Sequence, residues 1–161
     1  MQDAVNPLIF LLLADQVYRQ EVISYLKIYK FTNVEYFLTG EDLLKNMNKN
    51  PEIVIQDYSI DGISGMEIMT KAKKSNPSVE FIFFSEKDNI DTAIDCMKNG
   101  ASAYIVKDKM AFQKMISNVQ KINAATKIAS TKTTYKRGVV LFFILLTLLI
   151  IATIVLMINQ L

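Results

Sequence analysis

Short apolar runs alternate with amphipathic stretches from residue 8 to residue 126 of this 161-residue chain. Five of the runs have the length and composition of buried strands, and helical spacing of apolar residues fills the stretches between and after them. We expect strands over Leu8–Ala14, Asn33–Leu38, Glu52–Gln56, Phe81–Phe84 and Ser102–Val106. We expect helices over Gln16–Tyr29, Gly40–Asn48, Ile63–Lys74, Asn89–Lys98 and Met110–Ala125.

The apolar positions also predict which side of each helix faces the core. In the first helix, the predicted apolar stripe consists of Val17, Val22, Ile23, Leu26 and Ile28. In the second helix, the two adjacent leucines of residues 43–44 are expected to face inward.

Strands that alternate with helices predict an α/β fold, a doubly wound parallel sheet with helices on both faces. Right-handed crossovers make all five strands run in one direction, so their carboxyl ends share one edge of the sheet. Ligand and reaction sites of open α/β sheets lie along that edge. The residues that directly follow the strands are therefore the first candidates for chemistry.

Four polar residues follow strands in this way. Asp15 comes after the first strand and Asp57 after the third, and Ser85 and Lys107 come after the fourth and fifth. A carboxylate, a hydroxyl and an ammonium group that converge on one crevice suit the binding of a phosphoryl group. The carboxylate would be the nucleophile, and a divalent metal would lower the repulsion between the carboxylate and the negatively charged phosphoryl group.

Three segments of the chain resemble response-regulator receiver domains. The first is IVIQDYSIDGISGMEIM at residues 53–69, where Gly62 and Gly65 follow Asp57 by five and eight positions. The others are FIFFSEKDN at residues 81–89 and GASAYIVKD at residues 100–108. Because the segments occur in the family's order, the resemblance covers about residues 6–126.

The resemblance implies a flavodoxin-like fold with strand order 2-1-3-4-5 and five helices, and a signalling role without enzymatic activity. It implies that Asp57 accepts a phosphoryl group, that Ser85 and Lys107 bind it, and that Tyr104 is a switch residue. The implied partner is a histidine kinase or a phosphotransfer protein.

The end of the first strand departs from the family pattern. Aligned without gaps, the chain has Leu13 and Ala14 where the family has two adjacent acids that hold the metal. Asp15 then takes a third position, although a one-residue slip would bring it to the second acid position. The expected metal ligands are Asp15, Asp57 and the backbone carbonyl of Ser59, so any Mg²⁺ would bind weakly.

Three functions remain open on the sequence alone. One is a phosphoaccepting receiver, and another is a pseudo-receiver that works as a protein-interaction adaptor without phosphorylation. A flavodoxin-like cofactor binder is the third, but the first loop, ADQVY at residues 14–18, lacks the Gly or Ser/Thr residues of a phosphate cradle. The chain has no histidine, which excludes histidine-based catalytic triads, and a single cysteine, Cys96, excludes an intramolecular disulfide.

A second segment follows the predicted domain. Residues 139–158 are apolar and uncharged, and a helix of this length is about 30 Å long, as thick as a bilayer core. A buried core helix is the alternative, but the run is apolar on every face. We expect a receiver-like domain over residues 1–126, a basic linker over residues 127–137 and a transmembrane helix over residues 138–160.

The charges indicate how this segment is oriented. The net charge is −2 over residues 1–126 and +4 over residues 127–137. Basic residues beside a span favour the cytoplasm, so we expect a single-pass membrane protein with its domain in the cytoplasm and its linker near lipid headgroups. A mildly acidic domain does not favour nucleic acid. Without a further output domain in the sequence, signalling would pass through contacts with a membrane or cytosolic protein partner.

Overall fold

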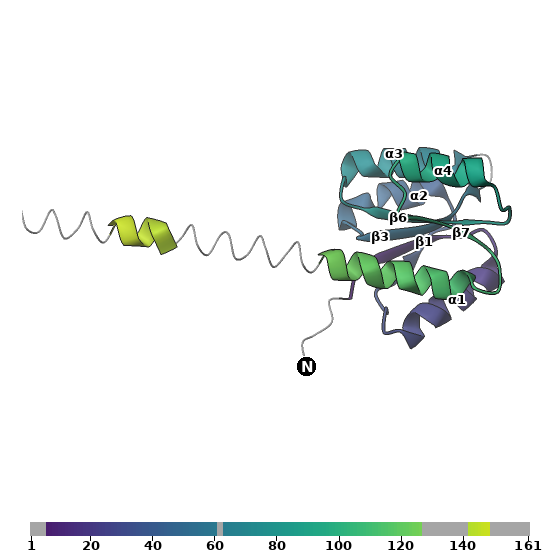
Figure 1. Ribbon diagram of the computed structural model, residues 1–161, viewed down its shortest axis with the longest axis horizontal. Coiled ribbons are helices and arrows are strands. Elements are labelled where there is room, and N and C mark those ends of the chain that lie inside the picture. The colour runs from purple at the N-terminus through teal and green to yellow at the C-terminus, as the bar shows by residue number, and fades with distance from the viewer. Residues whose placement is uncertain (1–5, 61–62, 127–141, 149–161) are drawn as a thin grey trace, which may run out of the picture. The chain divides into compact units, whose positions relative to one another are not determined.

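The structure is a computed structural model that describes residues 6–60, 63–126 and 142–148. The chain divides into two units, Met1–Asn123 and Ala124–Leu161. The first unit contains a five-stranded parallel sheet with the order β2-β1-β3-β6-β7 (Figure 1). Its strands are β1 (Ile9–Leu12), β2 (Val34–Tyr36), β3 (Ile53–Asp57), β6 (Glu80–Ser85) and β7 (Ala103–Val106).

Numbered along the chain, the five strands of this sheet have the order 2-1-3-4-5, which confirms the predicted order. The sequence did not predict a small antiparallel hairpin of β4 (Ser59–Ile60) and β5 (Ile63–Ser64). The predicted start of the third helix at Ile63 is therefore wrong, and α3 spans Gly65–Ser75. Ser64 sets this start because its side chain accepts a hydrogen bond from the backbone N–H of Met66.

The helices lie on both faces of the sheet, as predicted (Figure 1). α2 (Gly40–Lys45), α3 and α4 (Ile90–Lys98) cover one face, and α1 (Gln16–Ile28) and the helix over residues 111–126 cover the other. The predicted second helix is shorter than expected, since α2 gives way to a 3₁₀ turn, η1 (Met47–Lys49).

Each face of the sheet has its own apolar core. All four residues of β1 are buried, and successive side chains point to opposite faces. Ile9 and Leu11 pack in the cluster that contains Leu26 of α1. The alternate residues, Phe10 and Leu12, pack in the cluster below α2 and α3. β1 is therefore buried on both sides, as its uninterrupted apolar run predicted.

The predicted apolar stripe of α1 is partly wrong. Val22 and Leu26 are buried, but Val17 and Ile28 are 69% and 71% exposed. At 100° per residue, Val17 lies about 140° round the helix from Val22, and Ile28 about 160° from Leu26. Arg19 is buried instead, where its guanidinium donates to the carbonyl of Leu13 at 2.6 Å.

The predicted transmembrane segment lies largely outside the described residues, and the predicted linker at 127–137 lies wholly outside them. Residues 142–148 form a helix whose seven residues are all exposed. Within the parts of the chain that the structure describes, no helix is long and apolar enough to cross a bilayer.

Candidate functional site

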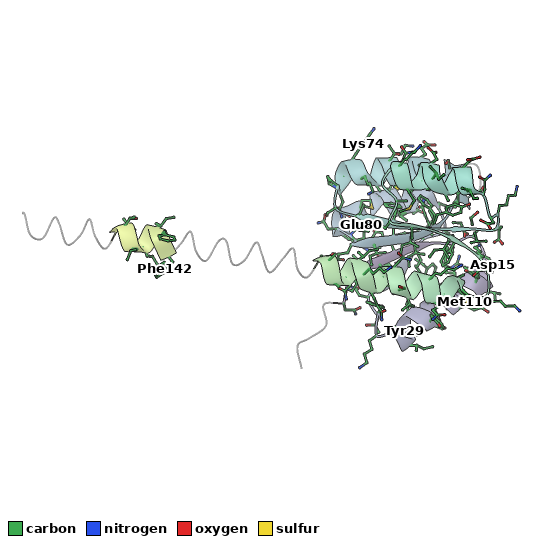
Figure 2. All side chains as sticks on the ribbon, in the orientation of Figure 1. Asp15, Tyr29, Lys74, Glu80, Met110 and Phe142 are labelled. Atoms are coloured by element: carbon green, nitrogen blue, oxygen red, sulfur yellow. The ribbon has the colours of Figure 1, made fainter. Side chains whose placement is uncertain are left out.

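The carboxyl edge of the sheet carries a pocket of about 500 Å³. Figure 2 shows Asp15 at the end of the sheet opposite Glu80, the first residue of β6. The pocket brings together all six residues that the sequence singled out: Asp15, Asp57, Ser59, Ser85, Tyr104 and Lys107. The parallel topology thus places side chains from four strand ends around one space, while their individual roles depend on their contacts.

Asp57 is the last residue of β3 and is only 6% exposed. Its Oδ2 accepts a hydrogen bond of 2.9 Å from the backbone N–H of Ala14, at the end of β1. Its Oδ1 lies 2.9 Å from Nζ of Lys107, as an ion pair. No donor among the described residues, Lys107 included, is aligned to form a hydrogen bond with Oδ1. One oxygen is therefore held by the backbone, and the other faces a cation.

Lys107 lies between two carboxylates. Its Nζ is 2.7 Å from Oε1 of Glu86 as well as 2.9 Å from Asp57, and its side chain is 11% exposed. Burial lowers the pKa of Lys107, but the hydrogen bond to Glu86 and the negative charges of Asp57 and Glu86 outweigh burial and raise it above its ordinary value. The lysine is therefore a permanent cation at neutral pH.

Ser85 and Tyr104 meet at one backbone carbonyl. The hydroxyl of Ser85 donates to the carbonyl of Lys87 at 3.0 Å and accepts from the N–H of Lys87 at 3.1 Å. The hydroxyl of Tyr104 donates to the same carbonyl at 3.0 Å. Ser85 thus lines the pocket, but both hydrogen bonds of its hydroxyl are made with Lys87, in the loop after β6. Through this carbonyl, Ser85 and Tyr104 share one acceptor.

Asp15 serves as the N-cap of α1. Its Oδ1 accepts a hydrogen bond of 2.9 Å from the backbone N–H of Tyr18. This bond, with smaller contributions from the N–H of Val17 and the charge of Lys107, lowers the pKa of Asp15 despite an opposing effect of desolvation. The exposed carboxylate therefore satisfies the helix terminus.

The residues at this edge do not fit a tightly bound Mg²⁺. Such a site needs carboxylate oxygens, but Leu13 is a buried core residue, and Asp15 caps a helix. The N–H of Ala14 already occupies Oδ2 of Asp57. Over residues 6–60, 63–126 and 142–148, no group of three or more Asp, Glu, His or Cys side chains is placed to hold a metal. Ser59 lines the pocket, and its carbonyl would be a lone additional ligand.

Sequence reasoning missed three partners of the predicted residues. The register of β6 and β7 pairs Ser85 with Val106, so the next residues, Glu86 and Lys107, are neighbours once that register is known. The N–H of Ala14 carries no sequence signal, because every residue except proline has one. Tyr18 places its ring centroid 4.6 Å from Nζ of Lys107, a contact between helix and strand end that no local pattern reveals.

Known proteins resemble this chain in sequence and in fold. The family described as the response regulator receiver domain matches residues 10–120. The luminescence regulatory protein LuxO of Vibrio campbellii is 30% identical over 91 residues, which are 56% of this chain and 20% of LuxO. The transcriptional regulatory protein YesN of Bacillus subtilis is 35% identical over 83 residues, 52% of this chain and 22% of YesN. The chain thus spans about a fifth of each of these relatives.

Solved structures share the fold at lower identity. A response regulator receiver domain protein from Clostridium thermocellum has a TM-score of 0.67 at 23% identity, covering 75% of this chain and 97% of its own. The response regulator DrrB of Thermotoga maritima has a TM-score of 0.65 at 22% identity, covering 73% of this chain and 52% of its own. At these identities the likeness concerns the fold alone.

Proposed function

Because the chain belongs to the response regulator receiver domain family, we propose that it receives a phosphoryl group on Asp57. Receiver domains are non-enzymatic signalling modules of two-component systems, and they work with histidine kinases. The family typically binds Mg²⁺, for which this chain lacks the acidic pair. A phosphohistidine on a kinase or phosphotransfer protein is the proposed donor.

The proposal is carried by Oδ1 of Asp57, a carboxylate oxygen without an aligned hydrogen bond that lies beside a cation at a pocket. In the transfer, Oδ1 forms a bond to phosphorus while the bond from phosphorus to the imidazole nitrogen of the donor breaks. The imidazole leaves with the electron pair of that bond and takes up a proton from water. Lys107 remains protonated and offsets the charge of the new acyl phosphate.

The loop after β6 would transmit the modification. A phosphoryl oxygen competes with the Lys87 carbonyl for the hydroxyl of Ser85. When Ser85 turns to the phosphoryl group, its two bonds to Lys87 are lost, and the Lys87 carbonyl keeps the bond from Tyr104. Tyr104 then moves with the loop, and this movement alters the surface offered to a partner.

A pseudo-receiver is the second candidate. It is favoured by the cation that already pairs with the carboxylate of Asp57. The ammonium of Lys107 already offsets the charge of the carboxylate, the N–H of Ala14 donates a hydrogen bond to it, and residues 13 and 14 carry no charge. A domain of this kind would dock a membrane or cytosolic protein with Asp57 unmodified. Loss of partner binding in Asp57→Asn would count against this candidate.

Phosphorylation of the full chain separates the two candidates. The chain is incubated with labelled acetyl phosphate, with and without Mg²⁺, and intact-mass spectrometry measures the addition of one phosphoryl group. We expect addition to the wild type and none to Asp57→Asn. Asp15→Asn is the matched control, because it removes a carboxylate from the same pocket. This variant should accept the phosphoryl group as the wild type does. Equal addition to Asp57→Asn, or none to the wild type, would refute the phosphoacceptor.

The same samples give the strength of metal binding. Titration of the wild type with Mg²⁺ should reach saturation only at concentrations well above those of a site with several carboxylates, because Asp57 is the main charged ligand. Tight binding by the wild type would contradict the weakened site and would point to Asp15 as a ligand.

We also propose that residues 138–160 anchor the domain in a membrane as a single span, with the domain in the cytoplasm. The uncharged run at 139–158 and the net charge of +4 before it support the proposal. So do the exposed apolar side chains of residues 142–148, including Phe142, Leu145 and Leu148.

Fractionation of cells tests the anchor. The full chain should remain in the membrane fraction after a carbonate wash, and a chain that ends at Thr126 should not. The matched control is the full chain with Leu145→Lys and Leu148→Lys, which keeps the length and removes the apolar character. Recovery of the full chain in the soluble fraction would refute the anchor.

A further inference from the structure

The ring of Tyr18 lies against the ammonium group of the site lysine. Nζ of Lys107 is 4.6 Å from the ring centroid, within the range of a cation–π interaction. Tyr18 belongs to α1 and Lys107 follows β7, so the contact joins the first helix to the last strand of the sheet. None of the contacts of Asp57, Ser85 or Tyr104 described above involves this ring.

The ring itself is firmly held. It packs edge-on against Phe84 with centroids 5.4 Å apart, and it lies 5.2 Å from the ring of Phe112. The backbone N–H of the same residue is held by the Asp15 cap at 2.9 Å. Tyr18 is therefore a fixed surface, whereas Lys107 has a flexible four-carbon side chain.

The two carboxylates at Lys107 compete for its ammonium. Asp57 is buried, but the side chain of Glu86 is 76% exposed and lies 2.7 Å from Nζ. A lysine held only by these charges would follow Glu86 toward solvent, where the ammonium is better hydrated. The ring face offers the cation a favourable contact on the buried side, at a point where Asp57 is still 2.9 Å away.

We propose that Tyr18 is a positioning residue that keeps the Lys107 ammonium beside Oδ1 of Asp57. Its effect on phosphorylation rests on the proposed function, but the contact itself does not. The hydroxyl of Tyr18 is buried and has no hydrogen-bond partner among the described residues, so the ring, and not the hydroxyl, does the positioning.

Nuclear magnetic resonance of the full, unphosphorylated chain tests the contact. The ring displaces the ε-methylene resonances of Lys107 upfield. We expect this displacement to persist in Tyr18→Phe, which keeps the ring, and to disappear in Tyr18→Leu. Tyr25→Leu is the matched control, because Tyr25 lies in the same helix and stacks on the same Phe112. Wild-type resonances in Tyr18→Leu would overturn the proposal.

The rate of modification by acetyl phosphate tests the consequence. Tyr18→Leu should be modified about two- to fivefold more slowly, as expected for the loss of one cation–π contact. Tyr18→Phe and Tyr25→Leu should match the wild type. An unchanged rate in Tyr18→Leu, with the displacement lost, would overturn the positioning role.

Two further outcomes stay interpretable. If no variant is modified and the wild type is not either, the phosphoacceptor fails, while the resonances still decide the contact. If Tyr18→Leu does not fold, pentafluorophenylalanine at position 18 replaces it, because this residue keeps the ring and reverses its quadrupole. The proposal then predicts the slower rate and a Lys107 ammonium displaced toward Glu86, and a wild-type rate would overturn it.

Discussion

Replacing Gly65 by alanine should displace the backbone at Asp57, although Gly65 does not itself line the pocket. Gly65 is the first residue of α3 and touches the backbone that carries Asp57. A Cβ atom added there would lie 2.8 Å from the carbonyl oxygen of Tyr58 and 2.9 Å from that of Asp57. It would also lie 2.9 Å from Nε2 of Gln56. Two of these three neighbours are backbone atoms, so the strand end itself must move.

The size of the effect follows from these contacts. Overpacking of a tight site costs about 1–3 kcal/mol. Alanine is favoured over glycine in a helix interior by about 1 kcal/mol, but less at a first position such as Gly65. The shift also stretches two hydrogen bonds, from Gly65 N–H to the carbonyl of Tyr58 and from Gln56 to the carbonyl of Gly65. We expect Gly65→Ala to lower the free energy of unfolding by about 2 kcal/mol.

Gly40→Ala is the matched control, since Gly40 is the first residue of α2. Its added Cβ would lie 2.6 Å from Cδ1 of Ile68, the far end of a side chain that can rotate. The loss should be at most about 1 kcal/mol. Urea unfolding of both variants, followed by far-ultraviolet circular dichroism, compares the two glycines. Equal stability of Gly65→Ala and Gly40→Ala would refute the close approach at Asp57.

Three further predictions concern the charged and aromatic residues of the site. Lys107→Met should lower the free energy of unfolding by about 2 kcal/mol because it leaves buried Asp57 without its cation. Glu86→Gln should change it by less than about 1 kcal/mol because Glu86 is exposed, and equal losses in urea unfolding would contradict this difference. Tyr18→Phe should raise the free energy of unfolding by about 1 kcal/mol, since it removes a buried hydroxyl without a partner among the described residues. A lower melting temperature for this variant would show that the hydroxyl is satisfied. Burial, assisted by the charge of Asp57, raises the pKa of Tyr18 above its ordinary value of 10.0, so the unfolded chain ionises first. The stability is then complete below pH 10 and decreases as the pH rises toward the raised pKa. Urea midpoints on either side of pH 10 should fall more in the wild type than in Tyr18→Phe, and equal falls would contradict the raised pKa.

The sequence by itself determined the arrangement of the sheet and the edge at which the pocket lies. The apolar runs were continuous enough to identify strands buried on both faces, and parallel strands bring their ends together whatever the loops between them are. Asp57, Ser85 and Lys107 could be predicted as neighbours for this reason. The spacing of Gly65 after Asp57 was also visible, and its physical cause is the close approach of α3 to the end of β3.

Only the tertiary structure decided how each of these side chains is used. It assigned Oδ2 of Asp57 to the N–H of Ala14, Ser85 to the loop carbonyl of Lys87, and Lys107 to a place above Tyr18. Each contact joins groups from different elements whose separation depends on the register and on helix rotation. A pattern of apolar and polar positions specifies which face a residue occupies, but the hydrogen bonds and ring contacts depend on distances of a few tenths of an ångström, which only packing sets.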